Sequence, residues 1–181
     1  AKVKAAKDLN EHADLVKDTI DALADVTEEQ KLTAKQAVED ALTAALNNAE
    51  NAGTIDAVIE AVSDGKSAMD VIYDGIEADN TGNVNAAKEK AIEELERVAN
   101  EQKDDIDALT HLTEEQKTTA KAAVDNEKDE GIYAVNNAET VENITVAKDT
   151  AIEQMKEQRK FAELQNAKNK ANTALDEKAT S

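Results

Sequence analysis

The stretch "DALADVTEEQK" at Asp21–Lys31 returns as "DALTHLTEEQK" at Asp107–Lys117, 86 residues further along the chain. In each copy a threonine, Thr27 or Thr113, is followed three residues later by a glutamine. This spacing is typical of a capping box, in which the threonine side chain accepts a hydrogen bond from the glutamine backbone N–H and the glutamine side chain reaches back to the threonine N–H. The two glutamates between them face the positive end of the helix dipole. The stretch therefore predicts a helix start, and the chain contains it twice.

Apolar residues recur at alternating spacings of three and four, the pattern of amphipathic helices that pack against neighbours. The first stripe predicts a helix over roughly Lys2–Ala24, and similar stripes restart after Thr27 and after Gly53. The second half repeats this plan, so six helices are expected, three in each half. The first stripe consists of Ala6, Leu9, Ala13, Val16, Ile20 and Leu23.

Three Asn-rich segments separate the remaining stripes: residues 47–56, 77–88 and 136–145. Asn and Gly tolerate the left-handed backbone conformation that ends many helices, and Asn or Thr can cap the next one. We therefore expect helix breaks at all three segments. The break at Asp79-Asn80-Thr81-Gly82-Asn83 is predicted to be a hinge between the two halves.

Composition limits the kinds of chemistry available to the chain. The 181 residues include no Cys, Pro or Trp, one Phe and two Tyr, and 40% are apolar. Ala is the most frequent apolar residue, and it favours helix but buries little surface. The formal net charge of -19 disfavours nucleic acid and anionic lipid as partners. No apolar run is long enough to span a bilayer, so membrane insertion is not expected.

The predicted fold is all-α, with two tandem antiparallel three-helix bundles arranged end to end as an elongated rod. The first bundle is expected at residues 1–78, the junction at 79–83 and the second bundle at 84–181. Short turns favour antiparallel neighbours, and the recurring punctuation indicates a tandem repeat. The last helix, from Glu142 to about Asp176, is predicted to extend toward a further repeat. Because the first residues begin within a helical pattern, we expect the sequence to be a segment of a longer protein.

The segments "LTEEQK" and "TAKAAVDNEKDEGIYAVNNAETVENITVAKDTAIEQM", with the tandem spacing, resemble the helical domain-of-unknown-function (DUF) repeats of large Gram-positive cell-wall-anchored surface proteins. Such arrays occur in staphylococcal and streptococcal adhesins and biofilm-associated proteins. The resemblance is best between Val84 and Met155. It implies an extracellular stalk, attached to the cell wall through regions outside this sequence, and it brings no catalytic residues.

The candidate ligand residues are few. His12 lies in the middle of a predicted helix and His111 in a turn, so we interpret both as solvated histidines and expect no metal site. The acidic run Asp104-Asp105-Ile106-Asp107 and the segment at 79–83 lack the ligand spacing of a calcium loop, which favours a solvated face or a turn.

The two tyrosines, Tyr73 and Tyr133, stand in "IY" pairs before Asn-rich breaks, at matching places in the two halves. Core or end packing is the expected role of each, with anchoring of a partner as the alternative.

The sequence predicts a non-enzymatic protein with no catalytic residues, cofactor or metal. The first hypothesis is a structural spacer or stalk repeat of a bacterial surface adhesin or biofilm-associated protein, present as a monomeric segment of a longer array. The alternative is a helical module that binds a host extracellular-matrix or plasma protein, for which an exposed apolar or aromatic patch would be the distinguishing feature.

Overall fold

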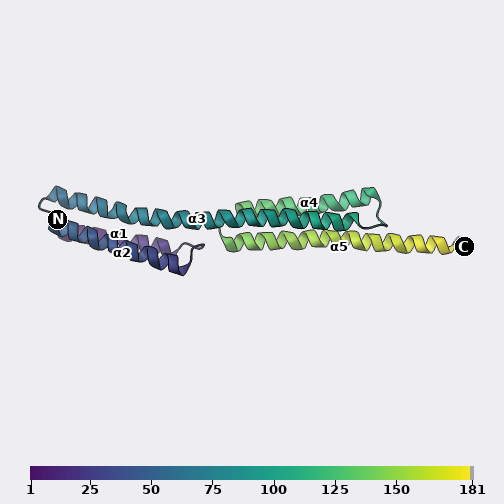
Figure 1. Ribbon diagram of the computed structural model, residues 1–181, viewed down its shortest axis with the longest axis horizontal. Coiled ribbons are helices and arrows are strands. Elements are labelled where there is room, and N and C mark those ends of the chain that lie inside the picture. Colours follow the sequence, from purple (N-terminus) through teal and green to yellow (C-terminus); the bar gives the residue numbers. More distant parts are fainter. Residues whose placement is uncertain (180–181) are drawn as a thin grey trace. The chain divides into compact units, whose positions relative to one another are not determined.

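The computed structural model describes residues 1–179 and contains five α-helices and no strand over that range. They are α1 (Lys2–Asp21), α2 (Glu28–Asn51), α3 (Ile55–Asp107), α4 (Glu114–Asn137) and α5 (Val141–Ala179), as Figure 1 shows. The prediction of an all-α chain is confirmed, and the last helix is continuous as expected. Residues 180 and 181 of the second predicted repeat lie outside the described residues.

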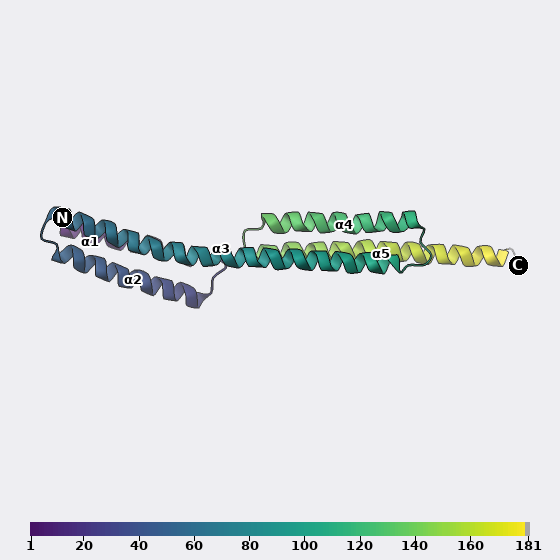
Figure 2. The ribbon, with the colours of Figure 1, turned by 45° about the horizontal axis from the view of Figure 1, so that its top comes forward.

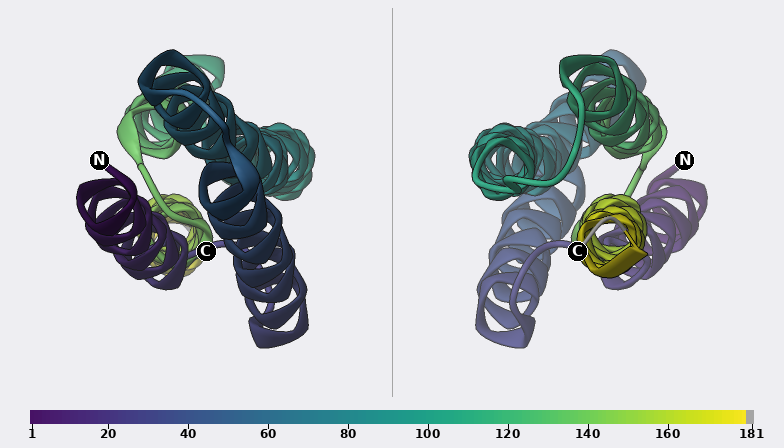
Figure 3. Two further views of the ribbon diagram at one scale, coloured as in Figure 1. Left: turned by 90° about the vertical axis from the view of Figure 1, so that its left-hand side faces the viewer. Right: turned by 90° about the vertical axis from the view of Figure 1, so that its right-hand side faces the viewer.

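The chain divides into two compact units, the first spanning Ala1–Val84 and the second beginning at Asn85. The boundary lies inside α3, whose N-terminal part belongs to the first unit and whose C-terminal part belongs to the second. Five helices therefore stand where six were expected, because the third and fourth predicted helices are one. In the first unit, α1, α2 and the N-terminal part of α3 lie alongside one another (Figures 2 and 3).

The helix break expected at Asp79–Asn83 is wrong, since α3 passes through these residues. Asn, Thr and Gly each disfavour a helix by only about 0.5–1 kcal/mol relative to Ala, which tertiary contacts can offset. Here Asn80 and Asn83 each form a hydrogen bond with Asp25, in the connection between α1 and α2. Flexibility at this junction stays a prediction.

The ends of α2 and α4 differ from the expected left-handed termination. No residue in the described range has a positive φ, and the C-cap residues Ala52 and Ala138 are extended instead. Thr54 and Thr140 cap the next helices, since their hydroxyl oxygens accept hydrogen bonds from backbone N–H groups three residues on, at 3.1 and 3.2 Å. The expectation that Thr begins the following helix is confirmed.

Both predicted capping boxes are present. Thr27 Oγ1 accepts from the N–H of Gln30 at 3.2 Å, and Gln30 Oε1 accepts from the N–H of Thr27 at 2.9 Å. The second box, at Thr113 and Gln116, has the same two distances. Each box satisfies two backbone N–H groups that a helix start would otherwise leave without a partner.

The buried residues repeat with the same 86-residue offset as the capping boxes. In the first unit one hydrophobic cluster takes side chains from α1, α2 and α3, including Leu9, Val38 and Met69. Their counterparts in the second unit, Leu95, Val124 and Met155, are buried as well. Further buried pairs at this offset are Ala5 with Ala91, Ala13 with Ala99, Ile20 with Ile106, Val26 with Leu112, Val58 with Ile144 and Ile76 with Ala162.

In each unit one close contact between two helices depends on a glycine. A Cβ added to Gly65 of α3 would overlap the Cβ of Ala45 on α2 and would lie 3.0 Å from a methyl group of Leu9. In the second unit the glycine is Gly131 of α4, where an added Cβ would overlap the Cβ of Ala151 on α5. At the 86-residue offset, Ala45 corresponds to Gly131 and Gly65 to Ala151. The two units therefore make the same contact with the glycine and alanine exchanged between helices.

Exchanging this glycine and alanine in the first unit tests the contact. Gly65→Ala should lower the free energy of unfolding by about 1–3 kcal/mol, because the new methyl group forces the helices apart. Adding Ala45→Gly should recover most of the lost stability, since the glycine and the alanine then stand on the same helices as in the second unit. Urea denaturation followed by circular dichroism measures both.

The matched control is Gly75→Ala on the same helix, where an added Cβ meets nothing within 4 Å. It should be neutral or stabilise by up to about 1 kcal/mol, because Ala is the better helix former. Equal effects of Gly65→Ala and Gly75→Ala would contradict the close-contact interpretation.

The capping boxes supply a second test. Thr113→Ala should lower stability by about 0.5–2 kcal/mol, because the N–H of Gln116 loses its acceptor. Thr119→Ala is the control, since its hydroxyl donates to the carbonyl of Glu115 inside the helix and caps nothing. Thermal melting curves compare the two variants, and an unchanged midpoint for Thr113→Ala would remove the capping role.

Candidate functional site

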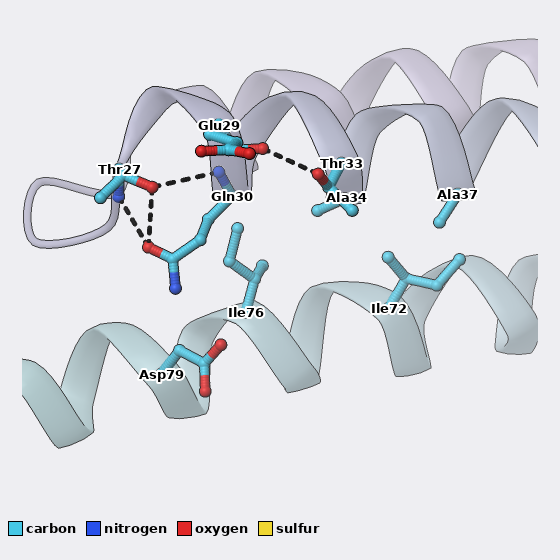
Figure 4. A pocket seen from close by; sticks show the side chains of 9 residues that line it. All are labelled: Thr27, Glu29, Gln30, Thr33, Ala34, Ala37, Ile72, Ile76 and Asp79. Atoms are coloured by element: carbon cyan, nitrogen blue, oxygen red, sulfur yellow. Dashed lines mark hydrogen bonds between the residues drawn. The ribbon is translucent and has the colours of Figure 1, made fainter.

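A surface groove lies in the first unit between the beginning of α2 and α3 (Figure 4). Its volume is about 420 Å³. Ala34 and Ala37 leave space on the α2 side, and Ile72 and Ile76 point into that space from α3. The other lining residues are Thr27, Glu29, Gln30, Thr33 and Asp79.

The second unit has the same groove between α4 and α5, with a volume of about 450 Å³. Eight of its lining residues are the 86-residue counterparts of residues in the first groove. The two isoleucines of the first groove are replaced by Gln158 and Ala162, and Asp79 by Gln165. The lining residues are Leu112, Glu115, Gln116, Thr119, Ala120, Ala123, Gln158, Phe161, Ala162 and Gln165.

Both hydroxyl groups of the first groove make hydrogen bonds within it. The hydroxyl of Thr33 donates to the carbonyl of Glu29 at 2.9 Å, and that of Thr27 lies 3.0 Å from Gln30 Oε1 (Figure 4). Neither hydroxyl contacts an imidazole or other base that would activate it as a nucleophile. The groove thus offers an apolar floor flanked by acidic and amide side chains.

Phe161 distinguishes the second groove from the first. Its side chain is 63% exposed, and its counterpart at the 86-residue offset is Gly75. Leu164, one turn further along α5, is 54% exposed. Two neighbouring exposed apolar side chains beside a groove form the kind of small patch that would distinguish a binding module from a spacer. Sequence analysis did not single out Phe161, although it is the only Phe and occupies a position where the other repeat has no side chain.

The two histidines have separate structural roles. Nε2 of His12 on α1 lies 2.8 Å from Oδ1 of Asp70 on α3. His111 lies in the α3–α4 connection, where its backbone N–H and C=O bond to Asn166 and Asn169. Within residues 1–179, no cluster of three or more His, Cys, Asp or Glu side chains could hold a metal ion.

The acidic run at residues 104–107 lies at the end of α3 and makes contacts within its unit. Asp105 Oδ2 is 3.4 Å from Nη1 of Arg159, and Asp107 Oδ1 is 2.7 Å from Nζ of Lys121. The segment at 79–83, read as a turn, is helical instead. Its two asparagines bond to a loop backbone, because their side chains point from α3 toward the α1–α2 connection.

The tyrosines are not equivalent, contrary to the expectation. Tyr73 is partly buried and packs against the hydrophobic cluster of the first unit, so its predicted core role is confirmed. Burial and the neighbouring carboxylate of Glu77 raise the pKa of Tyr73. Tyr133 is 73% exposed, so core packing is wrong for it. At the 86-residue offset Tyr73 corresponds to Arg159 and Tyr133 to Asn47. The similarity of the "IY" pairs is therefore not a match between equivalent positions.

Two ion pairs between helices occur in both units. Asp21 on α1 lies 2.6 Å from Lys35 on α2, and Asp107 on α3 lies 2.7 Å from Lys121 on α4. Lys17 on α1 lies 2.7 Å from Glu39 on α2, and Lys103 on α3 lies 2.9 Å from Asp125 on α4. The hydrogen bond from Lys103 lowers the pKa of Asp125, against the opposing effect of burial. These side chains are partly exposed, so each pair contributes at most about 1 kcal/mol.

The Lys103–Asp125 pair is expected to make the stability of the second unit sensitive to acid. A carboxylate with a lowered folded-state pKa contributes stability that is present above its unfolded pKa and is lost as the pH falls through the folded value. Asp125→Asn should therefore reduce the loss of stability between about pH 6 and pH 2. Urea midpoints across that range measure the effect, and Glu89→Gln, at an exposed position of α3, is the control. An identical acid dependence in wild type and Asp125→Asn would contradict this role.

Taken together, the duplicated core, caps, ion pairs and grooves define the class of the protein as an all-helical tandem repeat. The chain belongs to the DUF1542 family, described as a Domain of Unknown Function, which matches residues 1–74 and 87–162. The two matched ranges begin 86 residues apart, the offset found in the sequence and in the contacts.

Curated relatives are proteins of Staphylococcus aureus. The chain is 27% identical over 176 residues, 97% of its length, to the "Extracellular matrix-binding protein EbhA" of strain Mu3 and to the "Extracellular matrix-binding protein ebh" of strain JH9. It is 25% identical over 178 residues to EbhA of strain Newman. The chain spans about 2% of the length of the Mu3 and JH9 proteins and 5% of the Newman protein. No solved structure matches the chain.

These comparisons confirm the resemblance to repeats of Gram-positive surface proteins, and with it the predicted extracellular location. The relatives are named for matrix binding rather than for a catalytic activity. In residues 1–179, no helix combines the length and the apolar character needed to cross a membrane.

Proposed function

We propose that the chain is a structural spacer repeat of a bacterial cell-surface adhesin, built from two antiparallel three-helix bundles arranged end to end as an elongated rod. Its function is to set a distance between other domains, with attachment to the cell wall through other regions of the protein. The observation that carries the proposal is the duplication, with one 86-residue offset, of core residues, capping boxes and ion pairs. Such duplication preserves a shape and does not build a single reactive site.

Two further features support a spacer. The α3 helix belongs to both units, so no loop separates them in sequence and an end-to-end arrangement needs no flexible linker. The net charge of -19 would keep neighbouring stalks apart and the segment monomeric.

Small-angle X-ray scattering tests the proposed rod. A globular protein of this length would have a radius of gyration of about 16 Å. Helices that rise 1.5 Å per residue, placed end to end in two bundles, would give roughly twice that value. A radius of gyration near the globular value would reject the elongated spacer.

A host-protein-binding module is the second candidate function, and one observation favours it. Phe161 and Leu164 form an exposed apolar pair beside the second groove, and the relatives are named for binding extracellular matrix. The proposed partner is a host matrix or plasma protein that buries these two side chains.

Binding of the chain to immobilised fibronectin and fibrinogen, measured by surface plasmon resonance, separates the two functions. If the second candidate is right, Phe161→Ser should weaken binding at least about tenfold, as loss of an aromatic anchor does. Val146→Ser, at a 60% exposed position on the same helix, should leave binding unchanged. Equal effects of the two substitutions, or no binding of the wild-type chain, would leave only the spacer.

A further inference from the structure

One residue of the α1–α2 connection is held by α3 at both of its backbone polar groups. The N–H of Asp25 donates to Oδ1 of Asn80 at 2.8 Å, and Nδ2 of Asn83 donates to the carbonyl oxygen of Asp25 at 2.6 Å. Residues three apart on a helix lie on the same face, one turn from each other. Two hydrogen bonds, side by side along the helix axis, therefore fix the loop to α3.

The second unit contains the same arrangement 86 residues later. The N–H of His111 donates to Oδ1 of Asn166 at 2.8 Å, and Nδ2 of Asn169 donates to the carbonyl oxygen of His111 at 2.7 Å. The loop residue that the asparagines bind is Asp25 in the first unit and His111 in the second, whereas both asparagines are the same in the two units. This difference follows from the geometry, because only the backbone of the loop residue is bound.

At the opposite end of each unit, a lysine side chain forms a hydrogen bond to a backbone carbonyl group. Nζ of Lys2, at the start of α1, donates to the carbonyl oxygen of Glu50 near the end of α2. Lys88 makes the corresponding bond to Asn136 at 2.8 Å. A small cluster of Ala5, Ala49 and Val58 packs at the same end of the first unit.

The direction in which tension would act on the first unit follows from where the chain enters and leaves it. The chain enters beside the α2–α3 connection, as Figure 1 shows, and leaves along α3 just after Asn83, at the end where the α1–α2 loop is gripped. A pull between these two points therefore draws α1 and α3 lengthwise past each other. In this direction the two bonds to Asp25 are stretched together, so both must break before α3 can slide.

We propose that the asparagine pairs, Asn80 with Asn83 and Asn166 with Asn169, are mechanical latches that resist sliding of the third helical segment of each unit when the chain is under tension. The inference rests on the proposed spacer function, since only a spacer between an adhesive end and an anchored end is stretched along its length. A latch also accounts for two asparagines on helical segments that continue past them, where Asn is a poor helix former.

Single-molecule force spectroscopy tests the latches. The chain has no Cys, so handles can be attached at cysteines introduced at Ala1 and Ala179. In the wild type each unit should unfold as a separate event. In Asn80→Ala/Asn83→Ala one event should occur on the order of tenfold faster at constant force, because two hydrogen bonds to the loop are lost, while the other event stays unchanged.

A second pulling direction distinguishes a latch from ordinary stabilisation. Handles at Val3 and Asn51, both at the end of the first unit away from the loop, would peel α1 from α2 and would not slide α3. Asn80→Ala/Asn83→Ala should then have no more effect than Thr27→Ala, a capping variant without the latch contacts. Equal acceleration by the asparagine substitutions in both directions would overturn the latch.

The scattering experiment keeps the two proposals apart. A compact wild-type chain would contradict the spacer, whatever the force data show. An elongated chain whose unfolding under lengthwise tension is not accelerated by the asparagine substitutions would reject the latch alone.

Discussion

The packing of each unit depends on one contact between helices that has room for a single Cβ. Nearly half of the apolar residues are alanines, which bury little surface unless helices approach closely. The Gly65–Ala45 and Ala151–Gly131 contacts allow that approach. They let the few larger residues, such as Leu9 with Met69 and Leu95 with Met155, become fully buried. The short distance between the helices, and not large side chains, thus allows a small core to hold each unit together.

Sequence reasoning predicted the features that local chemistry determines. The capping boxes at Thr27 and Thr113, the apolar stripes and the 86-residue offset all depend on residues close together in the chain, and they are present. The helical state of residues 79–83 was missed because the groups that bond to Asn80 and Asn83 lie more than 50 residues away. Local propensity favoured a break, and a tertiary contact reversed it.

The candidate groove was harder to predict, since its walls come from two helices whose pairing the sequence does not state. A comparison of equivalent positions would nevertheless have found its distinctive residue. At the 86-residue offset Phe161 corresponds to Gly75. The "IY" similarity instead pairs Tyr73 with Tyr133, which are not equivalent, because Tyr73 is partly buried and Tyr133 is exposed. The correct register between repeats is set by the capping boxes, because they mark helix starts.

The two units differ most where packing does not constrain them. Equivalent positions in the two units share the apolar core, the helix caps, the asparagine bonds to the loop and the interhelical ion pairs. Even the exchanged glycine and alanine preserve one contact. By contrast, Gly75 and Phe161 occupy equivalent surface positions with no shared property. Repetition therefore maintains the shape that a spacer needs, while surface positions such as Phe161 are free to differ between units. A long array of such units could acquire binding sites one unit at a time without altering its geometry, so a stalk and a matrix-binding surface are compatible functions of one fold.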